Sequence, residues 1–412
     1  MSTELIGVLV LAAVFAVSSL RGLNMGVLAL VAAFLVGCVW LGHTPEQVLD
    51  GFPAEMFVVL VAVTFLFGIA RVNGTVEWMV HAAVRVAGQR LGVMPWVLFG
   101  LAALLCATGA ASPAAVAIVA PLGITFAVER GISPLYVGLM AVNGAAAGSF
   151  APTGVLGGIV NSSLHSSHLT VNGWQLFVGT FVFNVAVGVV TQVVFGRQRI
   201  HRTQALTSDS AADSTIVLGA EQAVTLCAMV ALVLGTTVLS LDTGFLALSL
   251  ASGLALLFRH TAQQASREIS WSVVLLVCGI VTYIALLQSL GIVDSLGRMI
   301  AAIGAPLLAA LIICYVGGVV SAFASTTGIL GALMPLAVPF LASGAIGTTG
   351  MVIALAASAT VVDASPFSTN GALVIANAPE HQRDDAYRGL LRWGAGVCGL
   401  APVAAWLVFV AV

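Results

Sequence analysis

The 412-residue chain is far too apolar for a water-soluble globule: 60% of its residues are hydrophobic, 7% are charged and the mean hydropathy is +1.12. Soluble domains carry roughly 25% charged residues, whereas runs of close to 20 apolar residues, as a bilayer requires, recur along this whole sequence. The formal net charge of −2 favours no nucleic-acid partner. The composition therefore predicts an all-α polytopic membrane protein embedded in a lipid bilayer.

Twelve apolar segments follow one another in two groups of six, separated by a polar stretch at residues 197–214. The N-terminus, residues 1–20, has no basic residue and carries Glu4, and Arg21 follows the apolar stretch. This is the wrong polarity for a cleaved signal peptide, so we expect a retained span with its N-terminus outside. The segments are residues 5–20, 24–42, 54–72, 93–128, 134–160, 174–195, 216–239, 244–258, 271–290, 306–341, 348–378 and 393–411. Amphipathic stretches at 73–90 and 291–304 occupy matching places in the two groups.

A shift of 214 positions aligns the second half with the first. It pairs Pro121 with Pro335, and it pairs two further features about 30 residues later, Pro152 with Pro366 and Gly157 with Gly371. One shift that aligns separated features in this way predicts two structural repeats.

Each repeat contains a block too long for one span. Residues 93–128 and 306–341 are interrupted by 108–113 and 321–328, which are too apolar for an external loop. Because non-helical backbone at membrane depth must be buried in protein or line a cavity, we expect two re-entrant helical hairpins. Each repeat then has five transmembrane helices and one hairpin, and the second repeat is inverted relative to the first.

The arginines agree with this topology. All 14 basic residues are arginine, and the expected crossings place 13 of them on one face, with only Arg298 opposite. The positive-inside rule makes this face cytoplasmic. We therefore expect both termini outside, the first hairpin open to the cytoplasm and the second open to the exterior.

Four interruptions are expected to converge near the middle of the bilayer: the two hairpin tips and the broken segments at 149–154 and 363–370. Pro113, Pro152 and Pro366 fit the first turn of a half-helix, and the hydroxyl residues before them fit N-cap positions. Helix N-termini offer unpaired N–H groups and partial positive charge, which suit a carboxylate. The competing interpretation is that these small residues only permit tight helix packing.

Asp363 is the acidic residue that the topology places inside the membrane, where carboxylates are rare and usually functional. The Asp363 carboxylate has three possible roles: it can bind a cation, carry a proton, or accept hydrogen bonds from the amides of Ser365–Phe367. No Arg or Lys is predicted nearby, and an uncompensated buried charge costs several kcal/mol. A doubly charged anion therefore needs an accompanying cation, and sodium held by hydroxyl and carbonyl oxygens is the natural candidate.

The remaining polar residues predict no cofactor. The six cysteines lie singly in apolar segments, and His165 and His168 have no evident third metal ligand. No Ser/His/Asp set converges on a span, so a membrane enzyme or a passive channel is poorly supported.

Several separated motifs resemble the N-terminal domain of the MatC-type malonate/dicarboxylate carriers over roughly residues 1–195. The matching stretches are Leu23-Asn24-Met25-Gly26, Gly51-Phe52-Pro53, Val72 to Trp78, Pro113 to Ile118 and Phe150 to Gly158. The second half is similar more loosely, through Asp363 to Gly371. More distantly, the chain looks like the divalent anion/sodium symporters of the ion transporter superfamily. That resemblance implies a homodimer in the inner membrane of a bacterium, and an elevator mechanism with a static scaffold and a mobile transport domain.

The resemblance assigns residues 1–92 and 216–305 to the scaffold and residues 93–215 and 306–412 to the transport domain. We predict import of malonate or a C4 diacid with Na⁺; proton coupling through Asp363 and a cation/proton antiporter are the alternatives. The predicted carboxylate-binding residues are Ser112, Pro113, Pro152, Thr153, Ser325, Thr326, Thr327, Ser365 and Pro366. The predicted cation ligands are Ser321, Thr326 and Asp363 beside the second tip, with a weaker set, Thr108, Ser112 and Ser149, beside the first.

Overall fold

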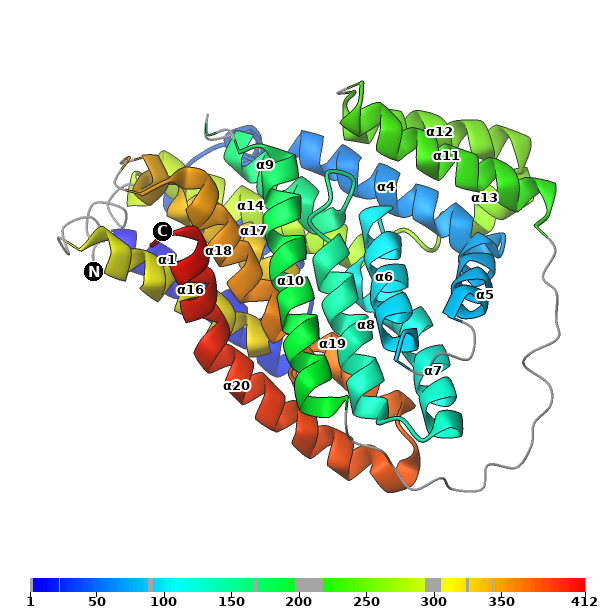
Figure 1. The fold of residues 1–412 in the computed structure, drawn as a ribbon. Coiled ribbons are helices and arrows are strands. Elements are labelled where there is room, and N and C mark those ends of the chain that lie inside the picture. The colour runs from blue at the N-terminus through cyan, green and yellow to red at the C-terminus, as the bar shows by residue number, and fades with distance from the viewer. Residues whose placement is uncertain are drawn as a thin grey trace.

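The computed structural model describes residues 3–21, 23–87, 92–165, 169, 171–196, 218–239, 241–292, 305–323, 326–342, 344 and 346–411. Within these ranges the regular elements are all helices (Figure 1). Six of the described helices are long and apolar enough to cross a membrane. The predicted class, an all-α polytopic membrane protein, agrees with this architecture.

In the first half of the chain, the helices follow the predicted apolar segments. They are α1 (Thr3–Arg21), α2 (Met25–Phe34) continued by the π-helical η1 (Leu35–Trp40), α3 (Pro45–Leu49), α4 (Ala54–Val72), α5 (Thr75–Ala87), α6 (Met94–Ala107), α7 (Ser112–Arg130), α8 (Pro134–Gly148), α9 (Val155–His165) and α10 (Gly173–Phe195). The long block is thus divided into α6 and α7, and the next segment is broken between α8 and α9.

The second half has the same order of divided and broken segments. Its elements are α11 (Ala220–Thr237), α12 (Thr243–Leu257), α13 (Arg259–Ala265), α14 (Trp271–Ser289), α16 (Pro306–Phe323), α17 (Thr326–Ala342), α18 (Thr348–Val361) with the 3₁₀ turn η2 (Val362–Ala364), α19 (Thr369–Asn377), the 3₁₀ turn η3 (Glu380–Gln382) and α20 (Arg383–Phe409).

Most predicted segments match these helices to within a few residues, and α5 lies in the amphipathic stretch 73–90. Its counterpart at 291–304 lies almost wholly outside the described residues. The expected start of the last span at residue 393 is wrong, because α20 begins at Arg383. Its charged first turns carry Asp384 and Asp385, which suit a helix N-terminus but interrupt the apolar pattern. The short helices α3 and α13 were not predicted.

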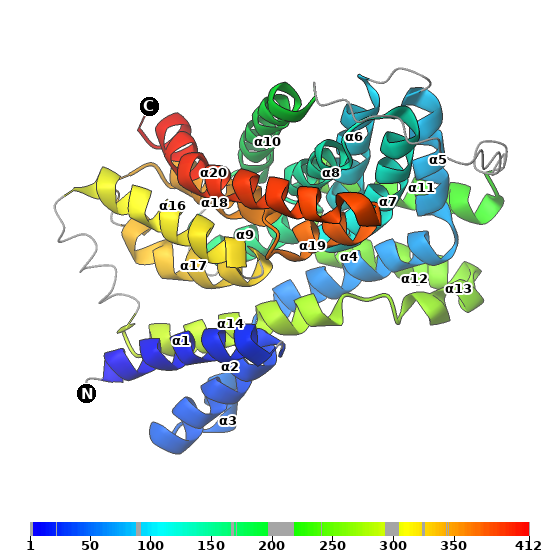
Figure 2. The same ribbon diagram turned by 90° about the horizontal axis from the view of Figure 1, so that it is seen from below.

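Figure 2 shows α1–α4 with α12–α14 along the lower side of the view and α10, α16, α18 and α20 along the upper side. We call α1–α4 with α11–α14 the α4 group, and α6–α10 with α16–α20 the α8 group; α5 lies at their boundary, where its Val76, Met79 and Val80 share a core with residues of α6–α8. Within the α4 group the Asn24 side chain donates to the Ser272 carbonyl at 2.8 Å, and Arg71 pairs with Glu268 at 2.7 Å. Within the α8 group Asn143 donates to Thr191 at 3.1 Å.

Contacts between the two groups are of a different kind. A Cβ built on Gly158 of α9 would lie 3.4 Å from Val59 Cγ1 of α4, and one built on Gly328 of α17 would lie 3.0 Å from Met25 Cε of α2. These are van der Waals contacts of small and apolar groups, with no directional bond between the atoms concerned. Each inter-helix hydrogen bond named above therefore holds one group together, whereas these cross-group contacts are apolar.

Glycines set the closest helix approaches inside each group. A Cβ atom built on Gly148 of α8 would lie 1.9 Å from the Ala103 carbonyl oxygen of α6. A Cβ atom built on Gly26 of α2 would lie 1.9 Å from the Leu275 carbonyl oxygen of α14. Small residues at such contacts let helix backbones approach closely in membranes.

We predict that Gly148→Ala lowers the free energy of unfolding by about 1–3 kcal/mol, because the new methyl group must displace backbone rather than a flexible side chain. Gly100→Ala is the matched control, since Gly100 of α6 faces open space and alanine is favoured over glycine in a helix. Thermal unfolding of the purified variants in detergent measures both; equal midpoints would contradict the close packing of α6 and α8.

Candidate functional site

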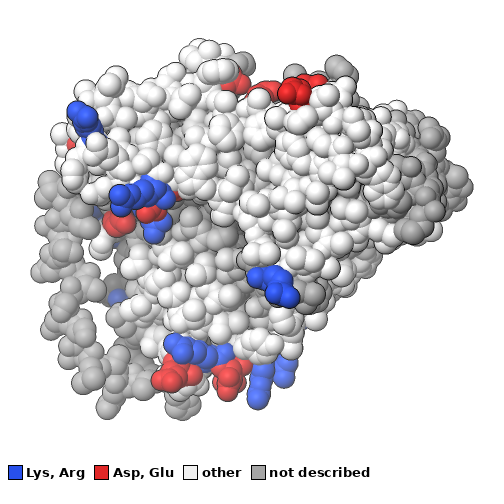
Figure 3. Space-filling model, turned by 180° about the vertical axis from the view of Figure 1, so that it is seen from behind, with Lys and Arg blue, Asp and Glu red and all other residues white. Residues whose placement is uncertain are grey.

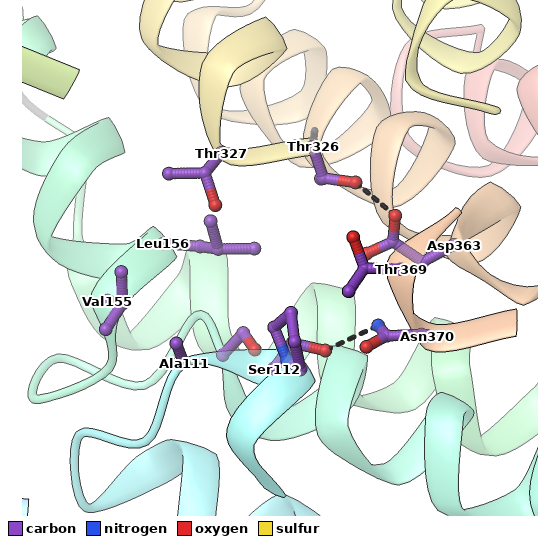
Figure 4. A pocket seen from close by; sticks show the side chains of 11 residues that line it. Ala111, Ser112, Val155, Leu156, Thr326, Thr327, Asp363, Thr369 and Asn370 are labelled. Carbon is purple, nitrogen blue, oxygen red and sulfur yellow. Dashed lines mark hydrogen bonds between the residues drawn. The ribbon is translucent and has the colours of Figure 1, made fainter. Parts of the chain in front are cut away.

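One small cavity, of about 40 Å³, lies where the two hairpin turns and the two broken segments meet (Figure 4). It has room for roughly three water molecules, at about 10–15 Å³ each. The residues that line it are Ala111, Ser112, Pro113, Ser149, Val155, Leu156, Thr326, Thr327, Asp363, Thr369 and Asn370. The predicted convergence of four interruptions is therefore present in the structure.

The first hairpin turn is held against α4. Gly109 has φ +110°, a conformation that favours glycine, and a Cβ there would lie 2.1 Å from Val63 Cγ1. Pro113 lies in the first turn of α7, as predicted, but the N-cap is Ala111 and not Ser112. The Ser112 hydroxyl is instead directed to the cavity and accepts a hydrogen bond from Asn370 Nδ2 at 2.8 Å (Figure 4). Thr108 turns away, donating to the Leu105 carbonyl at 3.0 Å.

The break between α8 and α9 differs from the expectation. Pro152 lies inside the break, because α9 begins only at Val155, so its predicted place in a first helical turn is wrong. The Ser149 carbonyl accepts from the N–H groups of Leu156 and Gly157 at 3.1 and 3.0 Å. These donors of α9 are thus already satisfied by the chain itself. Thr153 is directed to the first hairpin, where its hydroxyl donates to the Ala107 carbonyl, and it does not line the cavity.

The second hairpin turn brings a chain of hydroxyls to the carboxylate. Thr326, the first residue of α17, donates to the Asp363 carboxylate, and the Ser321 hydroxyl lies 2.8 Å from the Thr326 hydroxyl. Ser321, Thr326 and Asp363, predicted as one cation site, therefore lie in one hydrogen-bonded series. Thr327 lines the cavity beside them. Ser325, also predicted at this tip, lies outside the described residues.

The break between α18 and α19 also ends later than expected. Its N-cap is Ser368, whose hydroxyl accepts from Gly371 N–H at 3.1 Å, so Pro366 does not open the half-helix and Ser365 is not its cap. Ser365 instead donates to the Ala322 carbonyl of α16 at 2.7 Å. The prediction mistook the Ser-Pro pair for the helix start, although Ser368-Thr369-Asn370 supplies the capping chemistry three residues later.

Each of the two breaks contains a glycine that packs closely against a backbone carbonyl of the same break. A Cβ on Gly157 would lie 2.3 Å from the Ala151 carbonyl oxygen, and one on Gly371 would lie 1.9 Å from the Ser365 carbonyl oxygen. Both pairs are related by the same shift of 214 positions that aligns the halves of the sequence. Glycine is therefore needed at equivalent places, where the chain folds back onto its own break.

Thr369 and Asn370 were not predicted as site residues. Asn370 is 2% exposed, and its Oδ1 atom has no hydrogen-bond partner among the described residues, an unusual state for a buried acceptor. Their position in the first turn of α19 was hidden by the misplaced helix start. With the correct start, the first polar side chains of that turn would have been candidates.

Asp363 is the one charged side chain among the lining residues, and it is 9% exposed. The other polar groups on the wall are hydroxyls and an amide. Hydroxyl, carbonyl and carboxylate oxygens suit a hard cation, and the helix starts of α7 and α17 suit an anion. The arrangement can thus hold a small cation directly, while a diacid requires a wider cavity than the one present.

The comparisons with known proteins agree with the predicted resemblance. Residues 1–149 match the family model described as "Dicarboxylate carrier protein MatC N-terminus". Over these residues the resemblance to MatC-type carriers is confirmed. No curated protein sequence matches the chain significantly.

The fold has a solved counterpart. The chain is similar to the structure titled "Crystal structure of the Alcanivorax borkumensis YdaH transporter reveals an unusual topology", with a TM-score of 0.58 and 16% sequence identity. The match covers 88% of this chain and 87% of that one. The similarity therefore extends over both halves of the fold.

We predict that Ser368→Ala destabilises the protein by about 1 kcal/mol, the usual cost of losing a side-chain N-cap, because Gly371 N–H then has no capping oxygen. Ser368→Thr is the control that keeps the hydroxyl. Thermal unfolding in detergent measures both, and a Ser368→Ala midpoint equal to that of the wild type would show that the cap contributes nothing.

Proposed function

We propose that the protein is a secondary active transporter that imports a small dicarboxylate, malonate or a C4 diacid, together with Na⁺. The observation that carries this proposal is the convergence of both hairpin turns and both breaks on a cavity that contains Asp363 and is lined by no basic residue. The match of the N-terminal region to a dicarboxylate carrier model and the fold of a solved transporter support it.

Charge balance favours a cation in this cavity. A diacid would add negative charge beside the Asp363 carboxylate, which a helix N-terminus offsets only in part. We propose that Na⁺ binds next to Asp363 and Thr326, with the unpartnered Asn370 Oδ1 as a further ligand. Carboxylates would bind at Ser112 and Thr327, beside the starts of α7 and α17, once the hairpins have moved apart.

The contacts between the helix groups support a moving body. The α8 group is joined internally by side-chain hydrogen bonds such as Asn370–Ser112 and Ser365–Ala322, whereas its contacts to the α4 group at Gly109, Gly158 and Gly328 are apolar. Apolar contacts of this kind can slide past one another without breaking a directional bond. We therefore propose that the α8 group, residues 93–215 and 306–412, is the transport domain of a homodimeric elevator, and that residues 1–92 and 216–305 form its scaffold.

The membrane orientation follows from charge. On the face drawn in Figure 3 the blue side chains lie at the left, in the lower middle and at the lower edge, while a red patch at the top has no blue beside it. With the positive-inside rule, we propose that the arginine-rich side faces the cytoplasm of a bacterium and that both termini are outside.

We predict that Asp363→Asn reduces sodium-driven dicarboxylate uptake into proteoliposomes at least roughly tenfold, equivalent to losing about 1.4 kcal/mol of cation binding. The matched control is Asp242→Asn, an exposed N-cap of α12 at which asparagine caps equally well. Normal uptake by Asp363→Asn with unchanged sodium dependence would exclude the proposed role of the carboxylate.

The same assay separates the alternatives. Uptake in sodium-free vesicles driven by an imposed pH gradient, and lost in Asp363→Asn, would indicate proton coupling. If malonate and C4 diacids, with or without Na⁺, leave the thermal unfolding midpoint of the wild type unchanged, the cation/proton antiporter becomes the better interpretation.

For the moving body, we predict that a disulfide between Val59→Cys and Gly158→Cys stops transport, because it joins α4 to α9 across the interface that must slide. Reduction should restore uptake, and each single variant serves as a control for the substitutions. Maleimide labels the thiols that remain free, so the loss of labelling in the double variant, compared with its reduced form, measures how much disulfide has formed. Full transport by the cross-linked protein would contradict an elevator movement between these helices.

A further inference from the structure

A second cavity lies at the end of the α8 group that the arginines predict to be cytoplasmic. Its volume is about 450 Å³, and its walls come from the start of α8, the end of α10 and the first turns of α20. The lining residues are Leu135, Val194, Phe195, Asp385, Arg388, Gly389, Arg392 and Trp393. None of them lines the central cavity, so this is a separate site.

The walls of this cavity are firmly packed. A Cβ on Gly389 would lie 2.2 Å from Leu135 Cδ2, which brings α20 close to the start of α8. The rings of Phe195 and Trp393 meet edge to face with centroids 5.5 Å apart, which joins the end of α10 to α20. The cavity is therefore framed by three helices rather than by a loop.

Two arginines of α20 line this cavity. Arg388 and Arg392 are four residues apart on one face of α20, both are exposed, and neither forms an ion pair with any other described residue. Like charges at this spacing repel one another. Asp385 also lines the cavity and offsets one of the two charges, which leaves the lining with a net positive charge. An anion between the guanidinium groups would relieve the repulsion.

The surface beside the arginines is apolar. Val189, Val190, Val193 and Val194 of α10 are between 47% and 70% exposed, and Leu391 of α20 is 41% exposed. Such side chains face lipid in a membrane protein. A ligand that lies on this surface therefore combines a negative headgroup at α20 with hydrocarbon along α10, and a soluble phosphate would use only the first of these features.

We propose that this cavity binds an anionic phospholipid of the inner leaflet, with its phosphate between Arg388 and Arg392 and its acyl chains along α10. Basic pockets between transmembrane helices on the cytoplasmic side are suited to such headgroups. Guanidinium groups match the phosphate oxygens in geometry as well as in charge. The bound lipid would lie at the lipid-facing periphery of the protein and connect the cytoplasmic ends of α8, α10 and α20.

The test is binding of phosphatidylglycerol to the purified protein in an uncharged detergent, followed by native mass spectrometry and by the thermal unfolding midpoint. The double variant R388Q/R392Q should bind phosphatidylglycerol roughly thirtyfold more weakly, since each charge near an anionic headgroup contributes about a factor of five. Asp385→Asn removes one negative charge and should therefore strengthen phosphatidylglycerol binding by about a factor of five. R388K/R392K keeps the charge and should retain most of the binding.

The matched control is R259Q/R267Q, which removes the same charge from exposed arginines of α13 and the turn after it, away from the cavity. It should bind phosphatidylglycerol as the wild type does. An equal loss in this control, or equal binding of phosphatidylcholine and phosphatidylglycerol by the wild type, would overturn the site. If inorganic phosphate raises the midpoint as much as the lipid does, the ligand is a soluble anion and the lipid proposal fails.

Discussion

A buried carboxylate without a positively charged neighbour is the constraint on which this molecule depends. Asp363 is 9% exposed, and no basic residue lines the cavity that it faces. Removing an ionised carboxylate from water costs several kcal/mol even after relaxation, and one hydroxyl from Thr326 offsets only part of that cost. In the proposed function, a cation or a proton bound at this position supplies the missing compensation and thereby couples its binding to the arrangement of the residues around Asp363.

The coupling passes through elements from both halves of the chain. Thr326 begins α17, Asp363 lies in η2, and Asn370 reaches across to Ser112 at the start of α7. A cation that attracts the oxygens of Asp363 and Asn370 therefore acts on both hairpins at once. The cavity, at about 40 Å³, is too small for a diacid, so a diacid can lie between the hairpins only if they have moved apart.

Much of this could be predicted from the sequence, because the signals involved are local. Hydropathy placed α4 at residues 54–72, and the small residues around Ser112 marked a turn inside an apolar block. The helix starts at the breaks were harder to predict, since Pro152 and Pro366 looked like first-turn prolines although each half-helix begins three residues after its proline. The choice depends on which of several nearby oxygens accepts from the first N–H groups of the helix. The Ser149 backbone carbonyl does so for α9, and the Ser368 side chain, rather than that of Ser365, does so for α19.

This difference in capping also determines where an anion can bind. At α9 the Ser149 carbonyl already occupies the N–H groups of Leu156 and Gly157, so that helix start has little capacity left for a carboxylate. The equivalent position in the second half is Asp363, whose backbone and side chain are both engaged by hydroxyls. The breaks thus contribute mainly acceptor oxygens, which favour cations, whereas the hairpin helices α7 and α17 bring their positive ends to the cavity. Under the proposed function, the two tasks would fall to different elements: the breaks would hold the cation, and the hairpin helix starts would hold the anion that it accompanies.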